Sequence, residues 1–130
     1  MAHQFRTHYT LDEARALLPQ IRVWLDRIVQ LRRSLQECEE RLSGPLAAGA
    51  DCGGDTVNCW VAALAGLKAT LLEFQEREIQ LKDLDRGLVD FPSLRGDREV
   101  FLCWEKDEDD IEFWHDIGTG YSGRERLEPQ

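Results

Sequence analysis

Two long stretches of helical periodicity, separated by a glycine-rich gap, constrain the fold most. The first begins with Thr10-Leu-Asp-Glu13, a capping box in which the Thr10 hydroxyl and the Glu13 carboxylate each accept from the other residue's amide. Apolar side chains then recur at three- and four-residue steps as far as Leu42, which predicts one long amphipathic helix. Pro19 removes one helical hydrogen bond, so we expect a kink there, or a short helix that leads into a longer one.

A second helix is predicted from about Thr56 to Arg86, with Gly87 as its C-terminal stop. The residues between the helices, about 43–55, are rich in glycine and poor in apolar side chains, which predicts a mobile loop. The two helices, about residues 10–86, should therefore pack antiparallel as a coiled-coil-like hairpin. The apolar face of the second helix would contain Trp60, Leu64, Leu67, Leu71, Phe74, Leu81 and Leu84.

The helices offer more apolar surface than a two-helix hairpin can bury. This wider apolar band needs another partner, which is the C-terminal segment, a second copy of the chain, or both. We therefore expect a homodimer. The apolar side chains outside the face along which the two helices would pack are Trp24, Val29, Val57, Val61, Leu72 and Ile79.

The C-terminal region, residues 87–130, is predicted to form a β-hairpin packed on the helices. Two runs rich in β-branched and aromatic residues, Glu99–Glu105 and Asp110–Asp116, flank a short acidic turn. A turn centred between the runs would place Cys103 and His115 on opposite faces of the hairpin. The fold class is therefore α+β, and a length of 130 residues predicts a single domain.

Charge and composition exclude several functions. A formal net charge of −9 argues against non-specific binding to nucleic acid or to anionic membranes, because both depend on Lys and Arg. The first residues lack the apolar core of a signal peptide and no later run is long and apolar enough to span a bilayer, so we expect a cytoplasmic protein. The four cysteines have no Cys-x-x-Cys spacing and should be free thiols there.

A series of short motifs runs along nearly the whole chain in a specific order. They are Tyr9-Thr10, Glu13-Ala14-Arg15-Ala16-Leu17-Leu18-Pro19, Gly87-Leu88-Val89-Asp90-Phe91-Pro92, Leu102-Cys103-Trp104, Glu108, Ile111, Trp114-His115 and Gly123-Arg124. In this combination the chain resembles a bacterial family catalogued as domain of unknown function 2203 (DUF2203). Glu105 and Asp107 depart from the family pattern, which often has a basic residue and a glycine there. The resemblance implies no known reaction.

Two familiar motifs in this region do not fit their usual functions. Gly118 to Gly123 has the dinucleotide-binding spacing, but too few residues follow for the helix that such a site requires, so we expect a tight glycine turn instead. The acidic run Asp107–Asp110 lacks the glycine and the spacing of a calcium loop, which predicts a solvated turn. No complete nucleophile and base set is apparent.

The favoured functional hypothesis is a non-enzymatic homodimeric interaction module without a cofactor. It would present an aromatic and acidic C-terminal surface to another protein. The alternative is a small-molecule or metal-binding protein, or a small enzyme, with a pocket around Asp90, His115 and Arg124. The candidate ligand-binding residues are Asp90, Trp104, Glu108, Trp114, His115 and Arg124.

His115 is the central residue of the alternative, because His3 and His8 lie near the N-terminus. With Asp90 and Glu112 it would provide an imidazole and two carboxylates, a ligand set that suits a divalent metal such as Fe, Mn or Zn. The structural explanations are a packed His115 bonded to a carboxylate or a carbonyl, and an Asp90 that holds a turn and pairs with Arg124.

Overall fold

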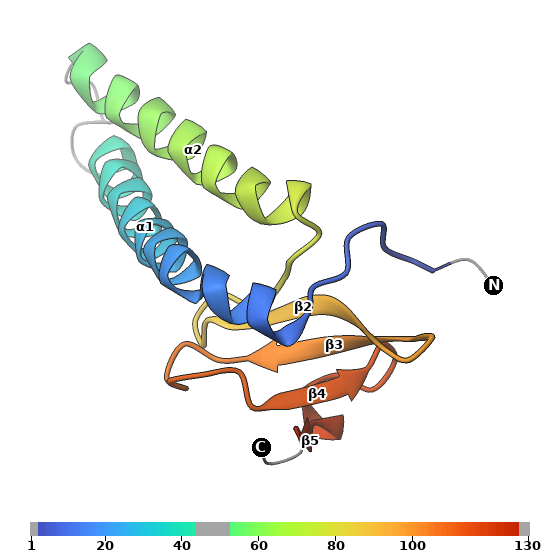
Figure 1. The fold of residues 1–130 in the computed structure, drawn as a ribbon. Helices are drawn as coiled ribbons and strands as arrows, with labels where there is room; N and C mark the ends of the chain where they lie inside the picture. The colour runs from blue at the N-terminus through green and yellow to red at the C-terminus, as the bar shows by residue number, and fades with distance from the viewer. Residues whose placement is uncertain (1–2, 44–52, 128–130) are drawn as a thin grey trace. The chain divides into compact units, whose positions relative to one another are not determined.

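The computed structural model describes residues 3–43 and 53–127, in two α-helices, five strands and a short 3-10 helix, Tyr121–Gly123 (Figure 1). The chain divides into two compact units, one of Met1–Arg22 with Phe74–Gln130 and the other of Val23–Glu73. The predicted α+β class is confirmed, while folding as a single cooperative domain stays a prediction. The helices are α1 (Leu11–Ser43) and α2 (Gly53–Glu76), and the strands are β1 (Gln80–Asp83), β2 (Leu88–Arg95), β3 (Arg98–Trp104), β4 (Phe113–Asp116) and β5 (Glu125–Arg126).

Helix α1 begins at the predicted capping box. The Thr10 amide donates to Glu13 Oε1 at 2.9 Å, and the Glu13 amide donates to Thr10 Oγ1 at 3.1 Å. The helix continues through Pro19 as a single element instead of two, and the kink predicted there stays a prediction. The predicted mobile loop falls mainly on residues 44–52, which lie outside the described residues, whereas Gly53–Asp55 belong to α2.

Helix α2 ends at Glu76, well before the predicted stop at Gly87. Glu78 adopts a φ of 60°, the left-handed conformation that commonly terminates helices. Its amide donates to the Gln75 carbonyl at 3.1 Å, and the Ile79 amide donates to the Phe74 carbonyl at 3.0 Å. This hydrogen-bond pair is a Schellman motif, in which glycine is usual at the position of Glu78. The predicted last turns of the helix are therefore a turn and strand β1.

The five strands form one antiparallel sheet in the order β1-β2-β3-β4-β5. Strands β3 and β4 correspond to the predicted hairpin, whereas β1, β2 and β5 were not predicted. Strand β2 contains Pro92, which cannot donate a hydrogen bond and is unusual inside a sheet. Strand β1 pairs with β2 only as far as Asp90, and beyond it the Tyr9 amide donates to the Pro92 carbonyl at 2.7 Å. No backbone carbonyl of an adjacent strand therefore lacks the hydrogen bond that the proline cannot donate.

The register of β3 and β4 differs by one residue from the predicted one. Cys103 lies opposite Phe113, and Phe101 lies opposite His115. Because side chains alternate between the two faces, a shift of one residue moves the whole of β4 to the opposite face. Cys103 and His115 therefore share a face, and Asp90 joins them because it lies opposite Cys103 on β2.

The other face of the sheet is covered by the first turns of α1. The Arg22 guanidinium lies 4.9 Å from the centre of the Trp104 ring and donates to the carbonyls of Lys106 at 2.8 Å and Glu108 at 2.9 Å. These contacts hold α1 against the turn that follows β3. The buried side chains of this layer include Ala14, Leu18, Ile21, Val89, Phe91, Val100, Leu102 and Trp104.

Two carboxylates hold the segment that precedes α1, residues 3–10. Glu78 Oε1 accepts from the amides of Arg6 at 2.8 Å and Thr7 at 2.7 Å. These hydrogen bonds, the one from Thr7 above all, lower the pKa of Glu78. Glu99 on β3 accepts from the two amides just before Arg6 in the same way. The segment is therefore an ordered part of the first unit.

In the second unit, the helical residues 23–43 and 53–73 run antiparallel. Cys38 Sγ lies 3.0 Å from Cys59 Sγ, and a Cβ at Gly66 would lie 3.2 Å from Leu31. On the same face of α2 as Gly66, small residues, Ala63 and Thr70, are buried. Leu64 and Leu71, which were predicted on this face, are instead exposed. The coiled-coil character of the pair stays a prediction.

Candidate metal and ligand site

Three adjacent strands bring three potential metal ligands together on one face of the sheet. Asp90 comes from β2, Cys103 from β3 and His115 from β4, and all three are buried, with at most 3% of their surface exposed. One ligand atom from each residue lies within 4.8 Å of the others. Such burial is unusual for an acid, which is almost never fully buried unless it is paired.

The hydrogen bonds of His115 define which of its ring nitrogens faces the cluster. Nδ1 lies 2.8 Å from the Asp116 carbonyl oxygen, which can only accept, so Nδ1 carries a proton. Nε2 lies 3.1 Å from Asp90 Oδ2, and this contact needs one proton, on either the imidazole or the carboxyl. A backbone carbonyl that fixes Nδ1 and leaves Nε2 directed at other ligands is the arrangement usual for metal-binding histidines.

Asp90 is incompletely satisfied for a buried carboxyl group. Burial raises its pKa, although the neighbouring His115 acts in the opposite direction. Its second oxygen, Oδ1, is buried and makes no hydrogen bond of regular geometry to a described residue, although a weaker contact with the Cys103 thiol helps to lower the pKa of Asp90. Buried polar atoms are nearly always paired, so an unpaired one needs an explanation, of which a bound ion or ligand is one.

Cys103 is held as a thiol at neutral pH. Burial, with the Asp90 carboxylate beside it, raises the pKa of Cys103 to about 12. Arg124 Nη1 lies 3.9 Å from its sulfur, and the same guanidinium bonds Glu108 at 3.3 and 3.0 Å. Arg124 also stacks on the Phe113 ring at 3.7 Å. A fixed cation close to the sulfur would favour a thiolate once a metal replaced the proton.

The cluster forms part of the wall of a small pocket of about 180 Å³. Gly120 and Tyr121 form part of its wall, where the chain turns tightly before β5. Gly120 has a φ of 68°, and a Cβ at Gly123 would lie only 2.6 Å from the Thr119 side chain, so both positions require glycine. Its other lining residues are Lys82, Leu88, Phe101 and Ile117.

The residues singled out from the sequence separate into three places. Asp90 and His115 meet in the buried cluster, and Asp90 lies within a strand instead of a turn. Arg124 and Glu108 pair with each other beside it, so the expected Arg124–Asp90 pair is wrong.

The third group of residues singled out from the sequence lies away from the cluster. Trp104 donates to the Glu108 carbonyl at 2.9 Å on the opposite face, Trp114 lies 4.3 Å from Arg95 on that face, and Glu112 pairs with Arg126 at 3.2 Å in an exposed ion pair.

Cys103 was not among the residues singled out from the sequence. The predicted register placed it on the face away from His115, in the interior of the hairpin, where thiols are usually inert. The signal that would have found it is its alternation with Phe101 together with a β3–β4 register shifted by one residue, which places both on the face of His115.

Carboxylate, thiolate and imidazole together suit a divalent transition metal. A thiolate favours Zn²⁺ over the harder Mn²⁺, and three protein ligands with one open position is the pattern of catalytic zinc sites. Glu112 does not belong to this set. The fold and the cluster thus define a small α+β protein with a buried acid, thiol and imidazole beside a pocket.

Sequence comparison identifies the family. A family model described as an uncharacterized conserved protein (DUF2203) matches residues 7–127, so the chain belongs to the DUF2203 family. No curated protein and no solved structure matches the chain. The resemblance to DUF2203 expected from the sequence is therefore confirmed.

Proposed function

We propose that this protein binds a divalent metal ion, Zn²⁺ in the first place, through Asp90, Cys103 and His115, and presents it to a small ligand. The observation that carries the proposal is the convergence of a buried carboxylate, thiol and imidazole, one ligand atom of each within 4.8 Å of the others, with Asp90 Oδ1 short of a regular hydrogen bond and His115 Nε2 directed into the cluster. A purely structural acid and histidine pair does not need the thiol.

Charge balance supports the exchange of protons for a metal. Without metal, the cluster holds one proton between Asp90 and His115 and another on Cys103, so it is neutral. A dication that displaces both protons binds a carboxylate, a thiolate and a neutral imidazole, and the complex of the ion with these three ligands is again neutral. The buried cluster therefore gains no net charge when metal binds, and burial of net charge is the costly alternative.

The pocket limits the ligand to a small molecule. Its volume of about 180 Å³ lies below the range of about 300–1,000 Å³ that is usual for drug-sized and nucleotide ligands. Its walls are mainly apolar, and Lys82 is the cation among them. These features favour a small organic anion that reaches the metal with its charged end.

The metal site is tested with Co²⁺, whose bond to a thiolate gives an intense charge-transfer absorption. Wild-type protein should show this band, and Cys103→Ala should lose it. His115→Phe should weaken binding by at least about 10-fold, because it removes a direct ligand. Affinity should rise with pH, since binding releases protons from the cluster.

Cys59→Ala is the matched control, because Cys59 is an exposed thiol outside the cluster. It should retain the wild-type Co²⁺ spectrum. Circular dichroism confirms that each variant is folded. A spectrum that is unchanged in folded Cys103→Ala would exclude the proposed ligand set.

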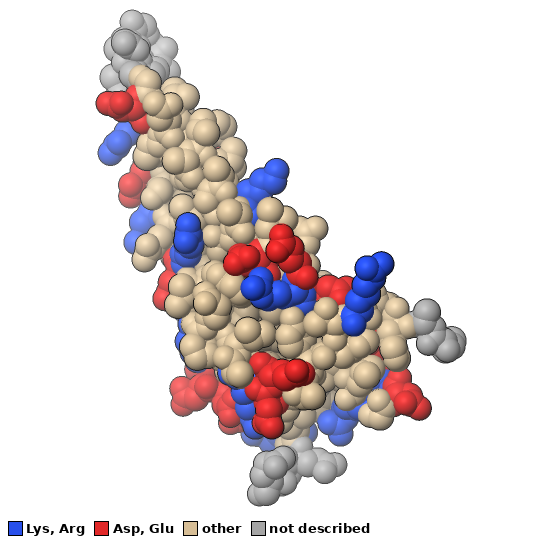
Figure 2. Space-filling view, turned by 45° about the horizontal axis from the view of Figure 1, so that its top comes forward, with Lys and Arg blue, Asp and Glu red and all other residues tan. Residues whose placement is uncertain are grey.

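A second candidate function is homodimerisation, which the surface of α2 favours. Large apolar side chains on this helix are exposed, including Val57 at 44%, Val61 at 51% and Leu64 at 43%. The surface over α2 carries few charged side chains (Figure 2). Contrary to the expectation from the sequence, Gly54–Glu76 is long and apolar enough to cross a membrane, by length and composition alone. A second copy of the chain, packed on this surface, would bury these side chains.

Dimerisation is measured by analytical ultracentrifugation. Wild-type protein should sediment as a dimer, and Val61→Glu with Leu64→Glu should sediment as a monomer, because charges on an apolar interface oppose association. Gln30→Glu, an exposed polar position of α1, is the control and should remain dimeric. A monomeric wild-type protein at high concentration would reject this candidate.

A further inference from the structure

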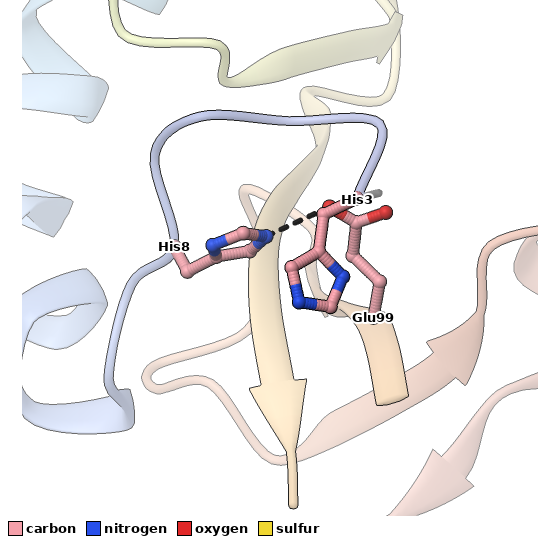
Figure 3. Close-up of side chains that lie close together, drawn as sticks. All are labelled: His3, His8 and Glu99. Atoms are coloured by element: carbon pink, nitrogen blue, oxygen red, sulfur yellow. Dashed lines mark hydrogen bonds and ion pairs between the residues drawn. The ribbon is translucent and has the colours of Figure 1, made fainter. Parts of the chain in front are cut away.

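A second group of metal-type ligands lies on the N-terminal segment and the start of β3. His3 and His8 come from the segment before α1, and Glu99 comes from β3 (Figure 3). The ring of His8 points toward the Glu99 carboxylate, and the ring of His3 lies beside both. Glu99 projects from the same sheet face as Cys103, four residues further along β3, but it does not belong to the buried cluster.

The three side chains are close enough to hold one ion. One ligand atom from each lies within 4.8 Å of the others. His8 Nε2 is 2.7 Å from Glu99 Oε2, and the ring centres of His3 and His8 are 5.0 Å apart. Ligands about 2.0–2.2 Å from a zinc ion lie about 3.3 Å from one another, so side-chain rotations suffice to reach that geometry.

Glu99 is fixed in position and ionised. Its two oxygens accept from the amides of Gln4 at 2.8 Å and Phe5 at 3.0 Å. Although burial acts to raise the pKa of Glu99, the hydrogen bonds from His8 and from these amides lower it. A carboxylate has about four acceptor positions, so one remains for a metal. No proton therefore has to leave the acid for an ion to bind.

The imidazole of His3 makes a ring contact but no hydrogen bond within the described part of the chain. Its ring contacts His8 edge to face, and no hydrogen bond joins the imidazole to another described residue. The side chain is exposed, so its nitrogens are accessible from solvent. An accessible imidazole beside a bonded imidazole and carboxylate completes a set of two histidines and one acid.

We propose that His3, His8 and Glu99 bind a second divalent metal ion, of the Zn²⁺ class, which fastens the N-terminal segment to β3. The ion would replace the hydrogen bond between His8 and Glu99, and water would occupy its remaining positions. The segment also carries Phe5, whose ring lies 5.5 Å from that of Phe101 in the pocket wall. Metal at this site therefore stabilises the segment that borders the pocket.

The test is a calorimetric titration of the full chain with Zn²⁺, without a polyhistidine tag and at slightly alkaline pH. Wild-type protein should bind one more equivalent than His3→Ala, or bind it at least about 10-fold more tightly. Because His3 is exposed, this variant should fold normally. Amide hydrogen exchange at Gln4 and Phe5 should slow when Zn²⁺ is added to wild-type protein, and should not slow in His3→Ala.

Two controls separate this site from the buried one. Gln4→Ala changes a neighbouring side chain outside the cluster and should leave the titration unchanged. Cys103→Ala should keep the His3-dependent equivalent while it loses the thiolate spectrum of the buried site. Identical titrations of wild-type protein and His3→Ala would overturn the proposal, whatever happens at Cys103.

Discussion

Replacing Asp90 by alanine is expected to lower the free energy of unfolding of the metal-free protein by about 2–4 kcal/mol. The change leaves His115 Nε2 without its partner at 3.1 Å in a site where His115 is only 1% exposed. It also leaves a cavity beside Cys103 and His115, on the face of the sheet that holds the cluster. Urea denaturation of the two proteins, both stripped of metal by a chelator, gives the difference.

A double-mutant cycle separates the pair from the individual side chains. Asp90→Leu with His115→Phe replaces both polar partners by apolar groups, which is often nearly neutral for stability. The double variant should therefore cost less than the sum of Asp90→Leu alone and His115→Phe alone, by about 1–3 kcal/mol. Glu112→Ala, which breaks an exposed pair with Arg126, should change stability by less than about 1 kcal/mol. Additive effects at Asp90 and His115 would show that the two do not act as a pair.

Features set by local chemistry could be predicted from the sequence. The capping box fixes the start of α1, because the reciprocal hydrogen bonds of Thr10 and Glu13 involve only four consecutive residues. The β-branched and aromatic runs that became β3 and β4 were equally clear. The α+β class follows from these elements alone.

Features that depend on distant contacts could not be predicted. Glu78 takes a conformation for which glycine is the usual signal, while its carboxylate accepts from Arg6 and Thr7 far away in the chain. These hydrogen bonds to Glu78 and the burial of Ile79 lie just beyond the end of α2 at Glu76. A proline is likewise unusual inside a sheet, and only the hydrogen bond from Tyr9 in the N-terminal segment shows why β2 tolerates Pro92.

The candidate site was predicted in part for the same reason. Asp90 and His115 stand out because apolar neighbours surround ionisable side chains, which is a local signal. Cys103 joins them only through the register of β3 and β4, which a one-residue difference in the turn decides. His3 and His8 meet Glu99 across most of the chain length, and no spacing in the sequence signals that contact.

The second large effect is expected at alkaline pH, where Cys103 should weaken the fold. Its pKa is raised from 9.0 to about 12 by burial, so the folded protein keeps the thiol proton to higher pH than the unfolded chain does. Its contribution to stability is therefore complete below about pH 9 and is lost as pH rises toward 12. At 1.36 kcal/mol for each pKa unit, the loss reaches at most about 4 kcal/mol.

Cys103→Ala has no thiol at this position and should not undergo this loss. Between about pH 9 and pH 12, the difference in the free energy of unfolding between metal-free wild-type protein and the variant should therefore shift by up to about 4 kcal/mol in favour of the variant. Urea denaturation at several pH values measures it, and the comparison cancels the titration of lysines and tyrosines that both proteins share. Gln30→Ala, at an exposed position of α1 without a titratable group, should follow wild-type protein. The ultraviolet absorbance of the thiolate provides an independent check. Ionisation of Cys103 near pH 9 in the folded chain would contradict the expectation, because a thiol that ionises at that pH is not held by the buried cluster.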